Sequence, residues 1–251
     1  MQALIERSEH DGIHELRFAR PPVHALDPEL CTQLREALAA AIADGADGIV
    51  LSGGPKVFSA GLDVPYLLTQ DTRGVREAWD AFLQGARALA GSPVPDVAAL
   101  NGHAPAGGCV YALCCDYRVM AAGDYRLGLN ETQVGLVAPE GIQRLMRRVV
   151  GPHRAERLLV AGELVESRRA LEIGLVDELA EIDQVPARAR AWLQGLLALP
   201  RRPVLETRAI ARAGVVAALR PELIDLDHFI AAWNDPDTQK GLRALMARLG
   251  K

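Results

Sequence analysis

The longest stretch of the chain without a charged side chain runs from Val97 to Cys115. It is long enough to cross a lipid bilayer as a helix. However, Asn101-Gly102-His103, Pro105 and Gly107-Gly108 interrupt it, and residues of these types form turns and break helices. The stretch therefore predicts a buried strand, a glycine-bearing loop and an apolar helix inside a globular protein, rather than a membrane span.

The same order of strand, loop and helix recurs along the chain. Asp27-Pro28 predicts the start of a helix, because aspartate caps helix N-termini and proline fits the first helical position. Apolar residues at helical spacing continue to Gly45, and a second amphipathic pattern runs from Val75 to Leu89. Short apolar runs predict strands at 2–7, 13–18, 49–51, 97–100 and 118–121. This alternation predicts an α/β fold.

Strand patterns end near residue 183, and only helical patterns follow. They cover 184–199, 201–218, 221–233 and 236–249. We therefore expect a core over residues 1–190 that carries the functional site and a helical region over residues 191–251. That region holds more apolar residues than a small layer could bury, which predicts an interface between copies of the chain. The side chains expected there are Leu193, Leu196, Leu197, Leu223, Ile224, Leu226, Phe229, Ile230, Trp233, Leu242, Leu245 and Met246.

Composition and missing motifs exclude several classes of function. The 251 residues have a formal net charge of −4, whereas duplex-binding proteins carry a basic surplus, so no nucleic-acid partner is expected. The first residues lack the pattern of a signal peptide, and we expect a cytoplasmic protein without a membrane partner. The four cysteines form no C-x-x-C pair, which predicts free thiols and no metal site. No phosphate-loop, dinucleotide or nucleophile-elbow motif occurs, and no cofactor is expected.

Three segments combine small residues with groups that can perform chemistry. Residues 57–63 directly follow a predicted strand. Residues 101–109 lead into the apolar helix, at whose N-terminus backbone N–H groups are free. Residues 128–135 carry one carboxylate, Glu131, among uncharged neighbours. Taken singly, each segment is also consistent with an ordinary turn, a packing loop or a solvated glutamate.

Together the three segments fit enolate chemistry. Removing the α-proton of a thioester places negative charge on the thioester oxygen. Two backbone N–H donors aimed at that oxygen stabilise the charge, and losing one such donor costs roughly 3 kcal/mol. A glutamate that is removed from water has a raised pKa and becomes a better base.

These motifs resemble those of the enoyl-CoA hydratase/isomerase (crotonase) superfamily over nearly the whole chain. Phe58-Ser59-Ala60-Gly61-Leu62-Asp63 is similar to the first oxyanion-hole loop of that family, and Asn101 to Cys109 is similar to the second. Pro105 to Cys109 and Gly128 to Gln133 are most similar to the subgroup of mitochondrial-type Δ3,Δ2-enoyl-CoA isomerases. The resemblance implies a crotonase-like spiral of ββα repeats with a C-terminal helical trimerisation region. It also implies a homotrimer or a hexamer.

The resemblance further implies roles for single residues. The amides of Leu62 and Gly107 would form the oxyanion hole, and Glu131 would be the catalytic acid/base. The substrate would be an acyl-CoA, so that coenzyme A is part of the substrate and not a cofactor. The other residues implied in substrate binding are Ala60, Asp63, Asn130, Phe229 and Lys240, the last two at positions that often close the CoA site of a neighbouring subunit.

One departure from the family pattern favours an isomerase. Family hydratases carry a second glutamate where this chain has Val110. Hydration needs a water held by two acid/base groups, whereas a shift of the double bond from C3 to C2 only needs a proton moved from C2 to C4. One carboxylate on one face of the substrate can make both transfers. The sequence therefore predicts an enoyl-CoA isomerase.

Two further residues leave alternatives open. Glu140 lies near a predicted helix start, where the helix dipole favours a carboxylate. As a second acid it would instead support a hydratase or an acyl-CoA hydrolase. Pro65 stands where many family members have lysine, so an arginine or Lys240 would contact the CoA phosphates. A non-catalytic acyl-CoA-binding protein, in which Glu131 is merely structural, is the third alternative.

Overall fold

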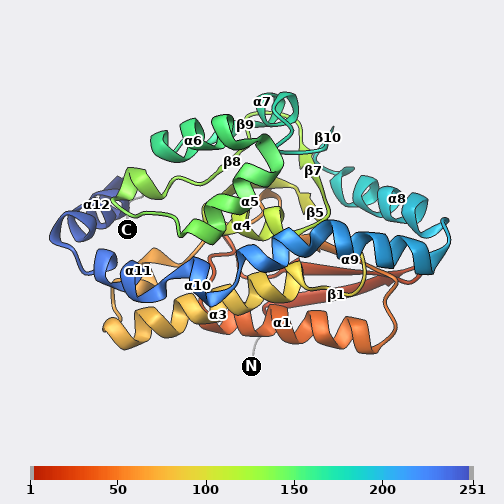
Figure 1. Ribbon diagram of the computed structural model, residues 1–251, viewed down its shortest axis with the longest axis horizontal. Coiled ribbons are helices and arrows are strands. Elements are labelled where there is room, and N and C mark those ends of the chain that lie inside the picture. Colours follow the sequence, from red (N-terminus) through yellow and green to blue (C-terminus); the bar gives the residue numbers. More distant parts are fainter. Residues whose placement is uncertain (1–2, 249–251) are drawn as a thin grey trace.

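Two β-sheets lie at the centre of the computed structural model, which describes residues 3–248 (Figure 1). The first has six strands in the order β1-β2-β3-β5-β7-β10, and the second has four in the order β4-β6-β8-β9. In the first sheet only β1 and β2 are antiparallel. The strands are β1 Ile5–His10, β2 Ile13–Phe18, β3 Gly48–Ser52, β4 Lys56–Val57, β5 Asp96–Leu100, β6 Gly102–Pro105, β7 Tyr117–Ala121, β8 Arg126–Gly128, β9 Val165–Glu166 and β10 Glu178–Ala180.

Successive strand pairs pass from the first sheet into the second. β3 leads to β4, β5 to β6 and β7 to β8, and helices follow each pair. This is the ββα spiral that the motif resemblance implied, and it places the loop that follows β4, the loop that follows β6 and the segment that follows β8 next to each other. The helices of this part are α1 Pro28–Ala43, α2 Val64–Leu67, α3 Thr72–Ala90, α4 Gly107–Cys114, the 3₁₀ turn η1 Glu131–Val134, α5 Glu140–Val150, α6 Pro152–Ala161 and α7 Ser167–Glu172.

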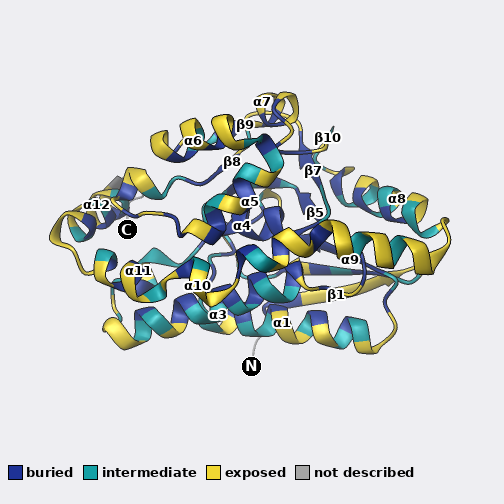
Figure 2. Ribbon diagram, in the orientation of Figure 1, coloured by how far each residue is buried: buried dark blue, intermediate teal, exposed yellow. Residues whose placement is uncertain are grey.

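Local signals explain where several of these helices lie. The Asp27 side chain accepts a hydrogen bond from the Leu30 N–H at 2.8 Å, so it caps α1 as predicted. Every residue of α4 is buried, which accounts for the absence of charge from Val97 to Cys115 (Figure 2). No helix within residues 3–248 is long and apolar enough to cross a membrane. The four cysteines are free thiols, as predicted, and all are buried.

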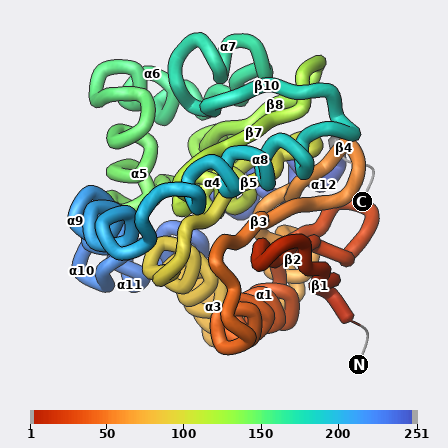
Figure 3. Tube along the Cα trace, turned by 90° about the vertical axis from the view of Figure 1, so that its right-hand side faces the viewer, coloured from red at the N-terminus to blue at the C-terminus, as the bar shows by residue number. Residues whose placement is uncertain are grey.

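The C-terminal helices fold back onto their own chain. They are α8 Val185–Leu197, α9 Arg201–Ala218, α10 Pro221–Ile224, α11 Leu226–Trp233 and α12 Pro236–Arg248. Helix α8 covers the face of the first sheet at β3, β5 and β7, whereas α9 and α10 pack on α5 and α11 packs on α3 (Figures 1 and 3). Helix α12 contacts η1 and α2, so the end of the chain reaches the segments that carry the candidate site residues.

The boundaries of two predicted elements were wrong. The first strand begins at Ile5 instead of residue 2 and extends to His10, because His10 pairs with Ile13 directly across the Asp11-Gly12 turn. The helix predicted over 221–233 is interrupted at Asp225, whose φ of 43° ends α10 and whose side chain caps α11. Residues 2 and 249 of the predicted elements lie outside the described residues. The strands at 56–57, 102–105, 126–128, 165–166 and 178–180 were not predicted. Four of them span only two or three residues, which show no periodicity, and residues 102–105 were expected to be part of a glycine-bearing loop.

The apolar side chains expected at an interface are used within the chain. None of them is exposed, and Leu193, Trp233 and Leu242 are almost completely buried. The reason is that α8 to α12 pack on the sheet, α3, α5 and η1, a layer that periodicity along the chain does not reveal. These side chains therefore do not indicate an interface, contrary to the expectation, and the trimer or hexamer stays a prediction.

Candidate active site

The two predicted oxyanion loops touch each other through their glycines. A methyl group on Gly61 would lie 2.8 Å from the backbone N of Gly107, and one on Gly107 would lie 3.2 Å from the Cα of Gly61. Gly61 also has a φ of +81°, a conformation that residues with a side chain rarely adopt. The loops at residues 57–63 and 101–109 therefore meet directly at these two glycines, and a side chain on Gly61 would clash with the backbone of Gly107.

Two backbone N–H groups at this contact have no acceptor within residues 3–248: those of Leu62 and Gly107. Gly107 is the first residue of α4, where an N–H has no partner inside the helix. On either side of Leu62, the Gly61 carbonyl accepts from Leu26 N–H at 2.8 Å and Asp63 N–H donates to the Leu26 carbonyl at 3.0 Å. Each of the two loops thus carries one backbone N–H group that is available to an acceptor from outside the described chain.

A strained residue precedes the Gly107 amide. Ala106 has φ 48° and ψ −119°, a backbone conformation that costs a residue with a Cβ roughly 1–3 kcal/mol. Its N–H donates to the Gly128 carbonyl at 2.8 Å, and Pro105 pairs with Gly128 between β6 and β8. Sheet pairing therefore holds the peptide that orients the Gly107 N–H.

A cavity of about 530 Å³ lies against the first loop. Its charged lining residues are Arg20 and Asp63, which form an ion pair at 2.8 Å, and most of the rest of its wall is apolar. Two apolar side chains come from α12 of the same chain, Leu245 and Met246. The complete lining is Arg20, Pro21, Pro22, Val23, Ala25, Ala60, Leu62, Asp63, Val64, Pro65, Leu245 and Met246.

Glu131 carries a buried carboxylate beside the second loop. It is the first residue of η1, and its Oε2 is buried without a hydrogen-bond partner among the described residues. Burial, and after it the charge of Glu131, raises the pKa of the Cys109 thiol in α4. Burial raises the pKa of Glu131 to about 7, an effect that its own backbone N–H partly offsets. A carboxyl group with this pKa can both accept and return a proton at neutral pH.

Packing holds η1 in place. Thr238 of α12 donates from its hydroxyl to the Gly135 carbonyl at 2.7 Å, and a methyl on Gly241 would lie 2.9 Å from the Val134 carbonyl oxygen. Asn130 precedes Glu131 as the N-cap residue of η1 and makes no capping bond with its side chain. The turn that presents Glu131 is therefore held by the C-terminal helix as well as by its own backbone hydrogen bonds.

Val110 stands at the position where family hydratases carry their second glutamate. Its side chain is apolar and buried in α4. Glu140 begins α5, is exposed, and forms ion pairs with Arg144 at 2.8 Å and Arg147 at 2.7 Å, which hold the pKa of its carboxyl below its usual range. Glu140 was predicted to lie near a helix start, and this placement is confirmed.

Of the predicted substrate-binding residues, Ala60, Leu62 and Asp63 line the cavity beside the first loop, whereas Gly107, Asn130, Phe229 and Lys240 do not. Phe229 is buried in α11 with its ring centroid 3.9 Å from that of Trp79, and it lines a separate cavity of about 330 Å³ together with Glu140. Lys240 is exposed on α12 and lines neither cavity. Sequence reasoning missed Arg20, Leu245 and Met246, because nothing in the pattern shows that residues far apart in the chain share one wall.

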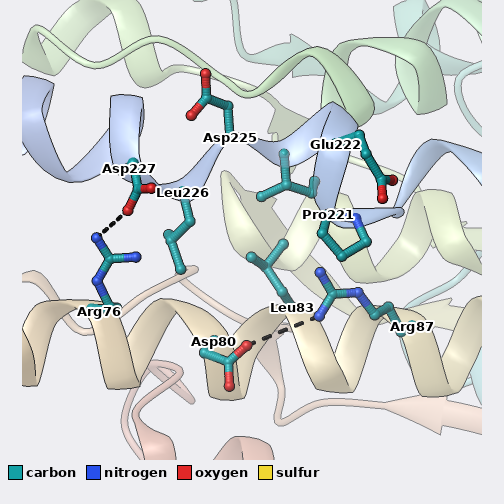
Figure 4. Close-up of a pocket in the computed structure, with 10 residues that line it drawn as sticks. Arg76, Asp80, Leu83, Arg87, Pro221, Glu222, Asp225, Leu226 and Asp227 are labelled. Atoms are coloured by element: carbon teal, nitrogen blue, oxygen red, sulfur yellow. Dashed lines mark hydrogen bonds and ion pairs between the residues drawn. The ribbon is translucent and has the colours of Figure 1, made fainter.

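A further cavity of about 410 Å³ lies between α3 and the α10–α11 junction (Figure 4). Four of its charged groups form ion pairs, Arg76 with Asp227 at 2.5 Å and Arg87 with Asp80 at 4.0 Å, and the carboxylates of Glu222 and Asp225 also line it. None of Leu62, Gly107 and Glu131 lines it. The candidate site is therefore the junction of the two glycine loops with η1.

The raised pKa of Glu131 predicts a pH-dependent cost to stability. The folded protein holds this proton more tightly than the unfolded chain, so the free energy of unfolding falls as the pH rises from about 4.5 to about 7. The loss is up to roughly 3 kcal/mol at high pH. Glutamine at this position cannot ionise, so Glu131→Gln should gain stability relative to the wild type between pH 5 and pH 8. Urea unfolding of both proteins at pH 5 and pH 8 measures the difference in their free energies of unfolding. If this difference is the same at both pH values, the carboxylate of Glu131 is well solvated.

Comparisons with known proteins show the family to which the chain is related. The sequence profile described as Enoyl-CoA hydratase/isomerase matches residues 8–248. The chain is 32% identical to human Enoyl-CoA delta isomerase 1, mitochondrial, over 99% of this chain and 83% of that protein. It is 33% identical to a Mycobacterium tuberculosis protein named "Probable enoyl-CoA hydratase EchA17", over 83% of this chain and 78% of the other. A crystal structure of human mitochondrial Δ3,Δ2-enoyl-CoA isomerase superposes with a TM-score of 0.93 at 31% identity, covering 98% of both chains.

Proposed function

The chain belongs to the enoyl-CoA hydratase/isomerase family, and from that premise we propose that it is an enoyl-CoA isomerase that moves a double bond from C3 to C2 of an acyl-CoA thioester. One observation carries the proposal: the buried Oε2 of Glu131 has no hydrogen-bond partner among the described residues, and Leu62 and Gly107, on two loops that meet at Gly61 and Gly107, have backbone N–H groups without an acceptor there. Val110 occupies the place at which a second acid/base group would stand.

The proposed reaction uses these groups in sequence. The thioester oxygen accepts hydrogen bonds from the N–H groups of Leu62 and Gly107. Glu131 takes the proton from C2, and the electron pair moves to the thioester oxygen as an enolate, which the two donors stabilise. The same carboxyl group then returns the proton to C4, the double bond forms between C2 and C3, and Glu131 is ionised again. The proton balance closes without a cofactor, so we propose none.

The cavity beside the first loop suits the arm of the substrate. Its wall is mostly apolar and begins at Leu62, one of the two proposed oxyanion donors. A pantetheine arm that lies against Ala60 and Asp63 would bring its thioester to that donor. Leu245 and Met246 would cover the arm from the same chain.

A hydratase is the second candidate, because one similar relative carries that name. Glu140 would have to be the second acid. Its exposed carboxylate is already bonded to Arg144 and Arg147, and its pKa is lowered, so it is a poor proton donor at neutral pH.

One assay separates these functions. 3-Hexenoyl-CoA and 2-hexenoyl-CoA are incubated separately with the protein, and the products are followed by mass spectrometry and chromatography. Isomerisation keeps the mass and changes the retention time, hydration adds one water, and hydrolysis releases free CoA. Unchanged substrates would mean that the protein only binds acyl-CoA and would overturn the proposal.

Replacing Glu140 with glutamine should reduce kcat for 3-hexenoyl-CoA by less than about tenfold. This carboxylate lies at a helix start, where it interacts with the dipole and with two arginines, and such surface contacts contribute only about 1 kcal/mol or less. Steady-state kinetics of Glu140→Gln beside the wild type test this. A loss as large as that of Glu131→Gln would favour a mechanism with two carboxylates.

A further inference from the structure

Arg20 lies in the segment between β2 and α1 and joins two helix caps. Its guanidinium pairs with Asp27 at 3.0 Å and with Asp63 at 2.8 Å, and it donates to the Ala25 carbonyl at 2.7 Å. The side chain is 29% exposed, and the two aspartates are 14% and 12% exposed. One cation thus holds both carboxylates, and Arg20 and Asp63 line the 530 Å³ cavity.

Each aspartate uses its other oxygen to cap a helix. Asp27 accepts from the Leu30 N–H at the start of α1, and Asp63 accepts from the Tyr66 N–H at the start of α2. Two backbone hydrogen bonds of Leu26, one from its N–H to Gly61 and one to its carbonyl from Asp63, complete the connection. The segments 25–27 and 61–63 are therefore tied together on both sides of Leu62.

This connection determines where the N–H of Leu62 points. That group has no acceptor of its own within the described residues and lies outside any helix, so only its neighbours orient it. Gly61 is further held by the Ser59 hydroxyl, which accepts from its N–H at 3.2 Å and donates to the His24 carbonyl at 2.8 Å. On the other side of Leu62, Asp63 depends on Arg20. An oxyanion donor acts only when it lies within hydrogen-bond distance of the developing charge.

We propose that Arg20 is a positioning residue for the oxyanion donor of Leu62. It acts by holding Asp63 against Asp27 and the 25–27 segment. The inference rests on the proposed function in one respect, that the Leu62 N–H binds the thioester oxygen.

Charge argues against Arg20 as a ligand for the CoA phosphates, although it lines the cavity. Its donors already meet two carboxylates and a carbonyl, and the group of Arg20, Asp27 and Asp63 has a net charge of −1. Such a group repels a phosphate. A loss of Arg20 should therefore impair carbonyl polarisation and turnover, and leave the affinity for free CoA nearly unchanged.

The test measures the polarised carbonyl directly. A 4-dimethylaminocinnamoyl thioester of CoA absorbs at longer wavelength when hydrogen bonds polarise its carbonyl, and it needs no turnover. We expect the red shift with Arg20→Gln to be at most half of that with the wild type. We also expect kcat to fall by roughly 10–100-fold, because a misplaced catalytic group lowers the rate by up to about 10²-fold. The Kd for free CoA should stay within about threefold. Arg20→Lys should be intermediate, because one ammonium cannot span both carboxylates as the guanidinium does.

Two variants make the result specific. Arg73→Gln removes an exposed arginine that pairs with Glu77 on α3, and it should behave as the wild type. Should Arg20→Gln fail to fold, Asp63→Asn keeps a side chain that can cap α2 but removes the ion pair, and it should lose the red shift in the same way. A full red shift in both Arg20→Gln and Asp63→Asn, or a large loss of CoA affinity at unchanged kcat, overturns the proposal. A wild-type protein that polarises the probe but does not isomerise 3-hexenoyl-CoA would refute the proposed function alone.

Discussion

Replacing Glu131 with glutamine should lower kcat for 3-hexenoyl-CoA by about 10⁴-fold or more while the affinity for the substrate changes only a few-fold. General acid/base catalysis contributes typically about 10²–10⁴-fold, and here the same group would act in both half-reactions. Glutamine has nearly the same shape and cannot accept the proton. The buried Oε2 of Glu131 has no partner among the described residues, so the substitution breaks no hydrogen bond of that atom.

Two measurements check this expectation. Stopped-flow absorbance at the conjugated thioester gives kcat, and exchange of the C2 protons with solvent deuterium reports proton removal alone. Glu140→Gln is the matched control, since it makes the same chemical change on an exposed carboxylate. If Glu131→Gln still exchanges C2 protons at the wild-type rate, another group is the base.

Replacing Gly107 with proline should remove one oxyanion donor without removing the helix that follows it. Gly107 is the first residue of α4, a position that accepts proline because its N–H has no partner in the helix. Losing one such donor costs about 10²–10³-fold in kcat. The expected result is a loss of that size in a protein that stays folded.

Gly107→Ala is the control, because it keeps the N–H. Its added methyl would lie 3.2 Å from Gly61 Cα, Leu26 Cδ1 and Phe82 Cε2, so it accounts for crowding alone. We expect Gly107→Ala to lower kcat by less than about tenfold and Gly107→Pro to lower it about 10²-fold further. Proline also restricts Ala106, so circular dichroism must show that both variants are folded. Equal activity of the two folded variants would mean that the Gly107 N–H is not a donor.

Several elements of the fold could be predicted from local signals. Asp27 before Pro28 marked the start of α1, and the uncharged stretch from Val97 predicted β5 and α4, although the expected loop between them contains the short strand β6. These signals act over a few residues, through caps, periodicity and burial, so they can be seen in the chain itself. The same holds for the glycines of the two loops, whose motif resemblance pointed to the family that the comparisons then showed.

Only the tertiary structure decided how the pieces of the site meet. The contact between Gly61 and Gly107, the burial that raises the pKa of Glu131 and the ion pairs that lower the pKa of Glu140 all depend on packing. The C-terminal helices were expected to face another subunit, yet α12 supplies Leu245 and Met246 to the cavity of its own chain.

The physical reason for this difference is how far apart along the chain the interacting residues are. A cap or an amphipathic face is determined by residues within one or two turns, and the amino-acid sequence therefore determined α1, α3, α4 and the presence of two loops with free amides. The guanidinium of Arg20 and the carboxylate of Asp63 are 43 positions apart, and the backbone amide of Gly107 is farther still. Their distances follow from how the sheets and helices pack, and it is this packing that turns two glycine loops and one glutamate into a single site.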